Sequence, residues 1–113
     1  MNVANETGEQ PVHVLVIGKD PAILQTVLRL LNDFKKARYH AVGTTEPEQA
    51  RELFSNMPVD LVLITNGLDR VTDASLREWL VQRRPGIPIL QHYGGGSGLL
   101  FNEITYFLSH RKS

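Results

Sequence analysis

The sequence of 113 residues predicts a single α/β domain, with a parallel sheet covered by helices on both faces. Two observations predict this fold class. Short runs of β-branched residues and leucine alternate along the chain with segments whose apolar residues recur at the helical period. The connections between these segments are short, so consecutive strands are expected to lie in one sheet with the helices packed against it.

Composition excludes several classes of protein. Hydrophobic residues make up 42% and charged residues 21% of the chain, as is ordinary for a globular domain. Twelve basic and twelve acidic residues balance, so no overall attraction to nucleic acid or to anionic membranes is expected. The chain has no cysteine, which excludes disulfides, thiolate metal sites and a cysteine nucleophile.

The N-terminus is polar and acidic and has no apolar stretch like that of a signal peptide. Residues 1 to 11 are therefore predicted to be a disordered leader, and residues 12 to 113 to form the domain. No run of apolar residues is long enough to cross a bilayer, and we expect a cytoplasmic protein.

The first half of the domain predicts two strands and two helices. A β-branched run from Val12 to Ile17 indicates a buried strand, which ends at Gly18. Asp20 and Pro21 then form the cap and first turn of a helix. Its apolar residues recur at helical spacing: Ile23, Leu24, Val27, Leu28, Leu31 and Phe34. A weaker strand follows over Tyr39 to Thr44.

A second helix is expected to start at the capping box of Thr45 to Glu48 and to stop before Pro58. The run from Val59 to Thr65 predicts a buried parallel strand that leads into a loop. The remaining elements are predicted as a helix, a strand and, after a glycine-rich loop, a last helix: Asp73 to Arg84, Ile87 to Tyr93 and Leu99 to Arg111.

Several of these segments, in this order and at this spacing, resemble the receiver domain of two-component response regulators. The similar stretches are Val-Leu-Val-Ile-Gly-Lys-Asp-Pro-Ala-Ile-Leu, Thr-Glu-Pro-Glu-Gln-Ala, Asp60-Leu-Val-Leu-Ile and Gly86-Ile-Pro-Ile-Leu. The resemblance implies a flavodoxin-like parallel sheet of four strands in the order 2-1-3-4, with four helices. It also implies that the family's fourth helix and fifth strand are missing, because one helix follows the fourth strand directly.

The resemblance implies a phosphorylation site from which this sequence departs. The family's phosphoacceptor aspartate corresponds to Thr65, and its acidic pocket to Gly18, Lys19 and Asp20, of which only the last is acidic. The family's switch serine or threonine corresponds to Tyr93. A hydroxyl cannot form an acyl phosphate, and Mg²⁺ requires several oxygen ligands, usually including carboxylates. The sequence therefore predicts a degenerate pseudo-receiver with no metal, no cofactor and no catalytic residue.

The main functional hypothesis is a signalling or adaptor module of two-component type that is not an enzyme and acts through protein–protein interaction. Its partner is an unidentified protein; a membrane or nucleic-acid partner is not expected. If the fifth strand is missing, the fourth strand becomes an open sheet edge, which native proteins cover or pair. A homodimer through that strand would close it.

The alternative hypothesis is a small anion- or nucleotide-binding protein. Open α/β sheets bind ligands at the carboxyl ends of their strands, where we place Lys19, His92 and the loop glycines Gly94, Gly95 and Gly96. The loop lacks the lysine and the serine or threonine of a phosphate-binding loop and the spacing of a dinucleotide fingerprint. A glycine linker and a solvated lysine are the favoured interpretations.

The aromatic and basic residues of the third helix have two interpretations. Trp79 is interpreted as a helix anchor, with an interface role as the alternative. The basic helix end of Arg77, Arg83 and Arg84 is interpreted as a solvated face, with contact to nucleic acid as the lesser alternative.

Overall fold

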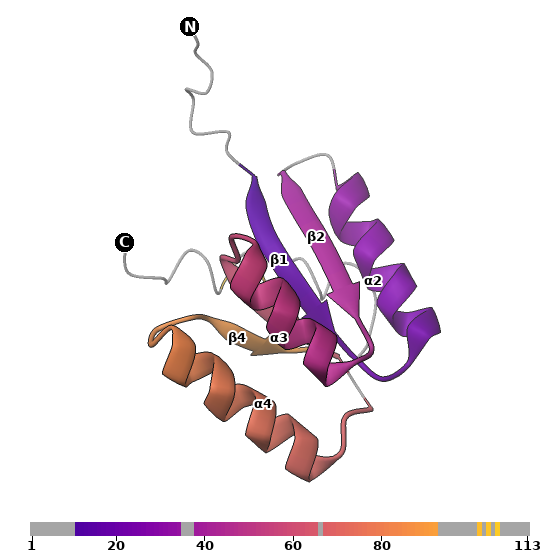
Figure 1. Ribbon diagram of the computed structural model, residues 1–113. Helices are drawn as coiled ribbons and strands as arrows, with labels where there is room; N and C mark the ends of the chain where they lie inside the picture. The colour runs from indigo at the N-terminus through magenta and orange to yellow at the C-terminus, as the bar shows by residue number, and fades with distance from the viewer. Residues whose placement is uncertain are drawn as a thin grey trace, which may run out of the picture.

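The computed structural model describes residues 11–34, 38–65 and 67–92, together with Asn102, Ile104 and Tyr106. Within these residues, four strands alternate with three helices (Figure 1). The elements are β1 (Val12–Ile17), α2 (Pro21–Asp33), β2 (Tyr39–Thr44), α3 (Pro47–Asn56), β3 (Leu61–Ile64), α4 (Arg70–Arg83) and β4 (Ile89–Gln91). The predicted leader lies outside the described residues except for Pro11. Of the predicted last helix, only the three separate residues named above are described, and all three are helical.

The strands form one parallel sheet in the order β2-β1-β3-β4, which confirms the predicted order. β1 lies between β2 and β3, so Val14 faces Ala41 on one side and Leu61 on the other. A strand in this position is covered by helices on both faces, which explains its nearly continuous apolar sequence.

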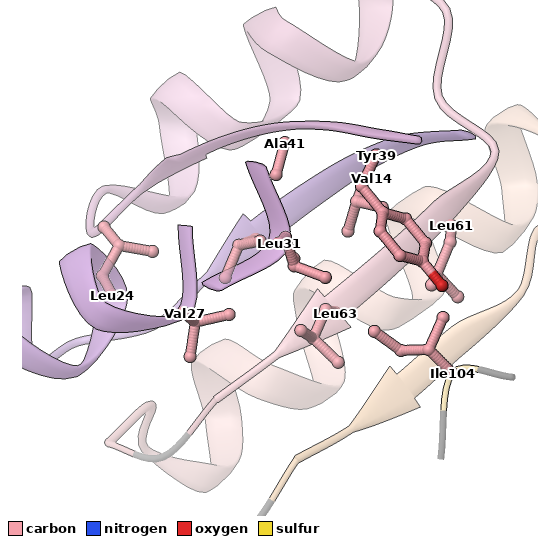
Figure 2. Packing of buried hydrophobic residues seen from close by; sticks show 10 residues of the cluster. Val14, Leu24, Val27, Leu31, Tyr39, Ala41, Leu61, Leu63 and Ile104 are labelled. Atoms are coloured by element: carbon pink, nitrogen blue, oxygen red, sulfur yellow. The ribbon is translucent and has the colours of Figure 1, made fainter. Parts of the chain in front are cut away.

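Side chains of β1 and β3 alternate between two hydrophobic clusters, one on each face of the sheet. On one face, Val14 and Leu63 pack with Leu24 and Leu31 of α2 (Figure 2). Ile104, which is completely buried, packs in this same cluster. The segment that contains Ile104 therefore reaches the sheet face that α2 covers.

The opposite face of the sheet is covered by α3 and α4, which lie in front of it in Figure 1. Leu15 and Ile64 from the strands pack there with Leu76 and Leu80 of α4, all of them at most 1% exposed. Complete burial of a leucine side chain contributes about 1.5–3 kcal/mol relative to an exposed one. Packing of α4 on the sheet is thus a main source of stability for this half of the domain.

Side-chain hydrogen bonds explain where the helices begin. The predicted cap of α2 is confirmed, because the Asp20 carboxylate accepts from the backbone of the first turn. The capping box predicted for α3 was wrong. The N-cap is Glu46, and no side chain caps the first turn of this helix. The Thr44 hydroxyl instead fixes the turn before the helix, since it accepts from the Glu46 N–H at 3.0 Å and donates to Gln49 at 2.6 Å. α4 begins at Arg70, earlier than predicted, because Asp69 caps it.

β3 and β4 are shorter than predicted, although backbone pairing continues beyond them. The Asp60 N–H donates to the His13 carbonyl at 2.8 Å, and the Thr65 N–H donates to the Ile17 carbonyl at 2.8 Å. The predicted ranges therefore included paired residues that flank the strands.

A helix side chain bonds to the outward backbone of β2, one of the two outer strands of the described sheet. At β2, the Asn32 side chain of α2 accepts from the Ala41 N–H at 2.9 Å and donates to the Ala41 carbonyl at 3.1 Å. It satisfies the outward backbone groups as a neighbouring strand would. β4 is the other outer strand in the described part of the chain.

None of the described helices is long and apolar enough to cross a membrane.

Candidate functional site

The carboxyl ends of β1, β3 and β4 meet at one edge of the sheet, where open α/β folds place their ligand sites. Backbone hydrogen bonds fix this convergence: the Thr65 N–H donates to Ile17, and the His92 N–H donates to the Ile64 carbonyl at 2.8 Å. Thr65 follows β3 and His92 follows β4 at this edge, and Gly18, Lys19 and Asp20 follow β1 there. The other predicted positions, Tyr93, Gly94, Gly95 and Gly96, lie outside the described residues.

Thr65 occupies the position that the resemblance assigned to the phosphoacceptor. Its side chain is 2% exposed, and its hydroxyl has no hydrogen-bond partner among the described residues. Burying a hydroxyl without a partner costs about 1–3 kcal/mol. The end of β3 thus carries a buried, uncharged hydroxyl where the family has a carboxylate.

Two of the three residues after β1, Gly18 and Asp20, form hydrogen bonds within the fold. Gly18 is buried, and its N–H donates to the Thr44 carbonyl at 3.3 Å. Asp20, which supplies the one carboxylate of the predicted pocket, accepts from the N–H groups of Ala22 at 2.9 Å and Ile23 at 3.3 Å. This carboxylate therefore caps α2.

Lys19 lies beside the loop that follows β3. Gly67 has a φ of +107°, and a Cβ atom at that residue would lie 2.6 Å from the Lys19 Cβ. A glycine is needed at this point for its positive φ and for the close approach. The exposed Lys19 side chain is thereby placed near the start of α4.

Asp69 is the carboxylate on which the Lys19 charge acts. The pKa of Asp69 lies below its usual value of 3.8, chiefly because Thr72 donates to it from its backbone N–H at 2.8 Å and from its hydroxyl at 2.9 Å. The positive charge of Lys19 lowers this pKa further. An incoming anion at Lys19 would thus have to compete with a carboxylate that the fold already holds there.

A side-chain network ties α4 to the same edge of the sheet. Arg77 donates from its Nε to Asp73 at 2.6 Å and from a terminal nitrogen to Gln91 Oε1 at 2.5 Å. The Gln91 amide in turn donates to the carbonyls of Ile64 at 3.1 Å and Thr65 at 3.5 Å. The guanidinium and amide groups at this edge therefore bond to one another and to the strand ends.

Sequence reasoning missed Asp69 and Gln91. Asp69 had a local signal, because an aspartate three residues before a threonine at a helix start is a common cap. Gln91 had none, since its partners come from β3 and from α4. Within the described part of the chain, no group of three histidine, aspartate or glutamate residues is placed to hold a metal ion.

No family model and no curated protein matches the sequence. Two solved structures are similar in fold. A response regulator receiver protein from Pseudomonas putida has a TM-score of 0.63 and 15% identity, over 87% of this chain and 80% of that one. The signal receiver domain of an HD domain-containing protein from Pseudomonas fluorescens Pf-5 has a TM-score of 0.69 and 18% identity, over 90% of this chain and 98% of that one. The chain therefore has a receiver-like, flavodoxin-like fold with four parallel strands in the order 2-1-3-4.

Proposed function

We propose that this chain is a receiver-like signalling or adaptor module of two-component type that is not phosphorylated on aspartate, is not an enzyme and acts by binding a protein partner. The observation that carries this proposal is Thr65, a buried threonine at the end of β3. An acyl phosphate forms only on a carboxylate, so this residue cannot accept phosphate from the donors that phosphorylate aspartate.

The surroundings of Thr65 support the same conclusion. Catalysis of phosphoryl transfer depends on metal ions and cations that neutralise the charge of the phosphoryl oxygens. Asp20 and Asp69 are the two carboxylates that the structure places after β1 and β3, and each caps a helix. Lys19 acts on Asp69, which does not favour the alternative of an anion or nucleotide site at this edge.

The test is incubation of the protein with acetyl phosphate and Mg²⁺, followed by intact mass spectrometry. We expect no increase of one phosphoryl group in the natural protein, whereas a receiver domain with its aspartate, treated in parallel, should gain one. Thr65→Asp alone is also expected to stay unmodified, because Lys19 and the capping role of Asp20 leave the metal without its ligands. A hydroxylamine-labile phosphoryl group on the natural protein would refute the proposal.

We also propose a homodimer that pairs β4 with its copy. The proposal is supported by the contrast between β2, whose edge is bonded by Asn32, and β4, which is the other outer strand of the described sheet. Unpaired strand edges favour pairing with another chain. Light scattering coupled to gel filtration should give twice the monomer mass at high micromolar concentration. A monomer mass at all concentrations would remove the dimer and leave the proposal about phosphorylation intact.

A further inference from the structure

Away from the sheet edge, α3 and α4 share a surface in which arginine guanidiniums lie over aromatic rings. This arginine–aromatic surface consists of Arg51 and Phe54 of α3, Trp79 and Arg83 of α4, and Arg84, which caps the end of α4. The guanidinium carbon lies 4.7 Å from the Trp79 ring centroid for Arg83 and 5.8 Å for Arg51. Arg84 stands over Phe54 at 5.2 Å, and the two rings meet edge to face at 6.0 Å. All three cations are within cation–π range.

These three arginines have no acidic partner among the described residues. Neither an ion pair nor a hydrogen bond joins Arg51, Arg83 or Arg84 to a carboxylate of the described residues, whereas Arg77 pairs with Asp73. The Arg51 Nε is buried and has no hydrogen-bond partner there. Because the whole chain has a net charge of zero, this surface concentrates positive charge that the fold does not neutralise.

Contact with the rings leaves these groups available to carboxylates. A cation–π contact uses none of the N–H donors of a guanidinium, so a carboxylate can still accept two hydrogen bonds from it at once. The Trp79 ring restricts the rotation of Arg83 and Arg51, so less conformational entropy is lost when a partner binds. Arginine and tryptophan are also the residues that dominate binding energy at protein interfaces.

A shallow depression adjoins this surface. It has a volume of about 220 Å³ and is lined by Val59, Asp60, Arg84, Pro85, Gly86, Ile87 and Pro88. The one acidic residue of this lining, Asp60, is engaged by the fold, because its carboxylate accepts from the His13 N–H at 2.9 Å. Arg84 belongs to both features and is held by a hydrogen bond to the Val59 carbonyl.

We propose that the arginine–aromatic surface docks an acidic segment of a partner protein. Its carboxylates would pair with Arg51 and Arg83, and a neighbouring side chain would enter the depression beside Arg84. This inference rests on the proposed function, that the chain works by protein contact, and names the surface and the chemistry of the partner. Nucleic acid fits less well, because binding to a phosphate backbone commonly uses about 6–10 contacts and this surface offers three arginines without acidic partners.

The test is selection of a phage-displayed library of random linear peptides on the immobilised full chain. Selection is repeated on Arg83→Glu and on Arg70→Glu, which carries the same change of charge at the exposed other end of α4. We expect peptides rich in aspartate and glutamate, with affinity measured by fluorescence anisotropy. Binding should fall about tenfold or more for Arg83→Glu, as is typical when a charge-assisted contact is lost. It should change less than about twofold for Arg70→Glu, because a distant surface charge is screened by salt.

Arg83→Gln, which keeps the aliphatic stem, provides a second variant in case the glutamate disturbs packing on Trp79. Thermal unfolding should show that it remains folded while it binds the selected peptides more weakly. Selected peptides without acidic residues would overturn the proposal, and so would equal binding by all the variants. A single-stranded oligonucleotide that binds more tightly than the peptides, with the same dependence on Arg83, would also overturn it. None of these outcomes bears on phosphorylation, which the acetyl phosphate experiment decides separately.

Discussion

The carboxyl edge of the sheet and the arginine–aromatic surface treat their charged groups in opposite ways. At the edge, Asp20 and Asp69 cap helices and Arg77 bonds to Asp73 and Gln91. On the arginine–aromatic surface, which lies on α3 and α4, three guanidiniums rest on two rings without a carboxylate in reach among the described residues.

The charged side chains at the carboxyl edge are bonded within the fold, whereas those of the arginine–aromatic surface have no acidic partner among the described residues. A charge already engaged by caps and internal bonds has little remaining capacity for a ligand, whereas an unpaired, ordered cation can pair with a new anion. The edge that a receiver-like fold would lead one to examine first is therefore the less promising binding site.

Both regions depend on α4, so loosening that helix should damage them together. Leu80→Ala removes a completely buried side chain between α4 and the sheet and should lower the free energy of unfolding by about 2–5 kcal/mol. Urea unfolding followed by circular dichroism measures this. Val81→Ala, at a side chain that is 46% exposed, is the control and should have little effect. Equal effects for the two variants would contradict the packing described for α4.

The contact between the two loops at the carboxyl edge can be broken at Gly67. Gly67→Ala should destabilise the protein by about 1–3 kcal/mol, because a residue with a side chain is strained at positive φ and its methyl group would collide with Lys19. Gly86→Ala is a matched control, since Gly86 has a φ of +91° and open space around it. It should cost less in thermal unfolding, and a cost as large as that of Gly67→Ala would mean that the Lys19 contact contributes nothing.

The buried threonines Thr65 and Thr44 should respond to valine in opposite directions. Thr65→Val should raise the free energy of unfolding by about 1 kcal/mol, because it removes a buried hydroxyl that has no partner in the described part of the chain. Thr44→Val should lower it by about 1 kcal/mol, because its hydroxyl bonds to Glu46 and Gln49. Chemical unfolding of both variants measures the pair. A loss of stability in Thr65→Val would show that its hydroxyl is bonded.

The smallest effect is expected from the charge of Asp69. Its folded-state pKa lies below its usual value, so its charge stabilises the folded protein above about pH 3.8 and this contribution is lost as the pH falls further. Asp69→Asn keeps a capping side chain without the charge. The variant should melt slightly below the natural protein at neutral pH, with the gap closing below pH 3.8. A gap that does not change with pH would show that the charge contributes nothing.

Much of the fold could be predicted from local sequence patterns, because the spacing of apolar residues and the identity of capping residues indicate where strands and helices form. The bounds of β1 and β2 and the Asp20 cap agree with the structure. The strand order also agrees, but it was implied by the resemblance to receiver domains and not by local pattern. The capping box of α3 was predicted wrongly because the helix begins one residue later, after Glu46, and the turn that leads into it is fixed by the Thr44 hydroxyl at the end of β2.

The sequence by itself determined the α/β fold class and the absence of a carboxylate at Thr65, because both depend on residue type and spacing. Only the tertiary structure decided how the charged groups are paired. The contact of Gln91 with Arg77, the action of Lys19 on Asp69 and the cation–π contact of Arg51 with Trp79 each join elements that are separate in the sequence. Such pairings depend on packing geometry, which local spacing does not specify.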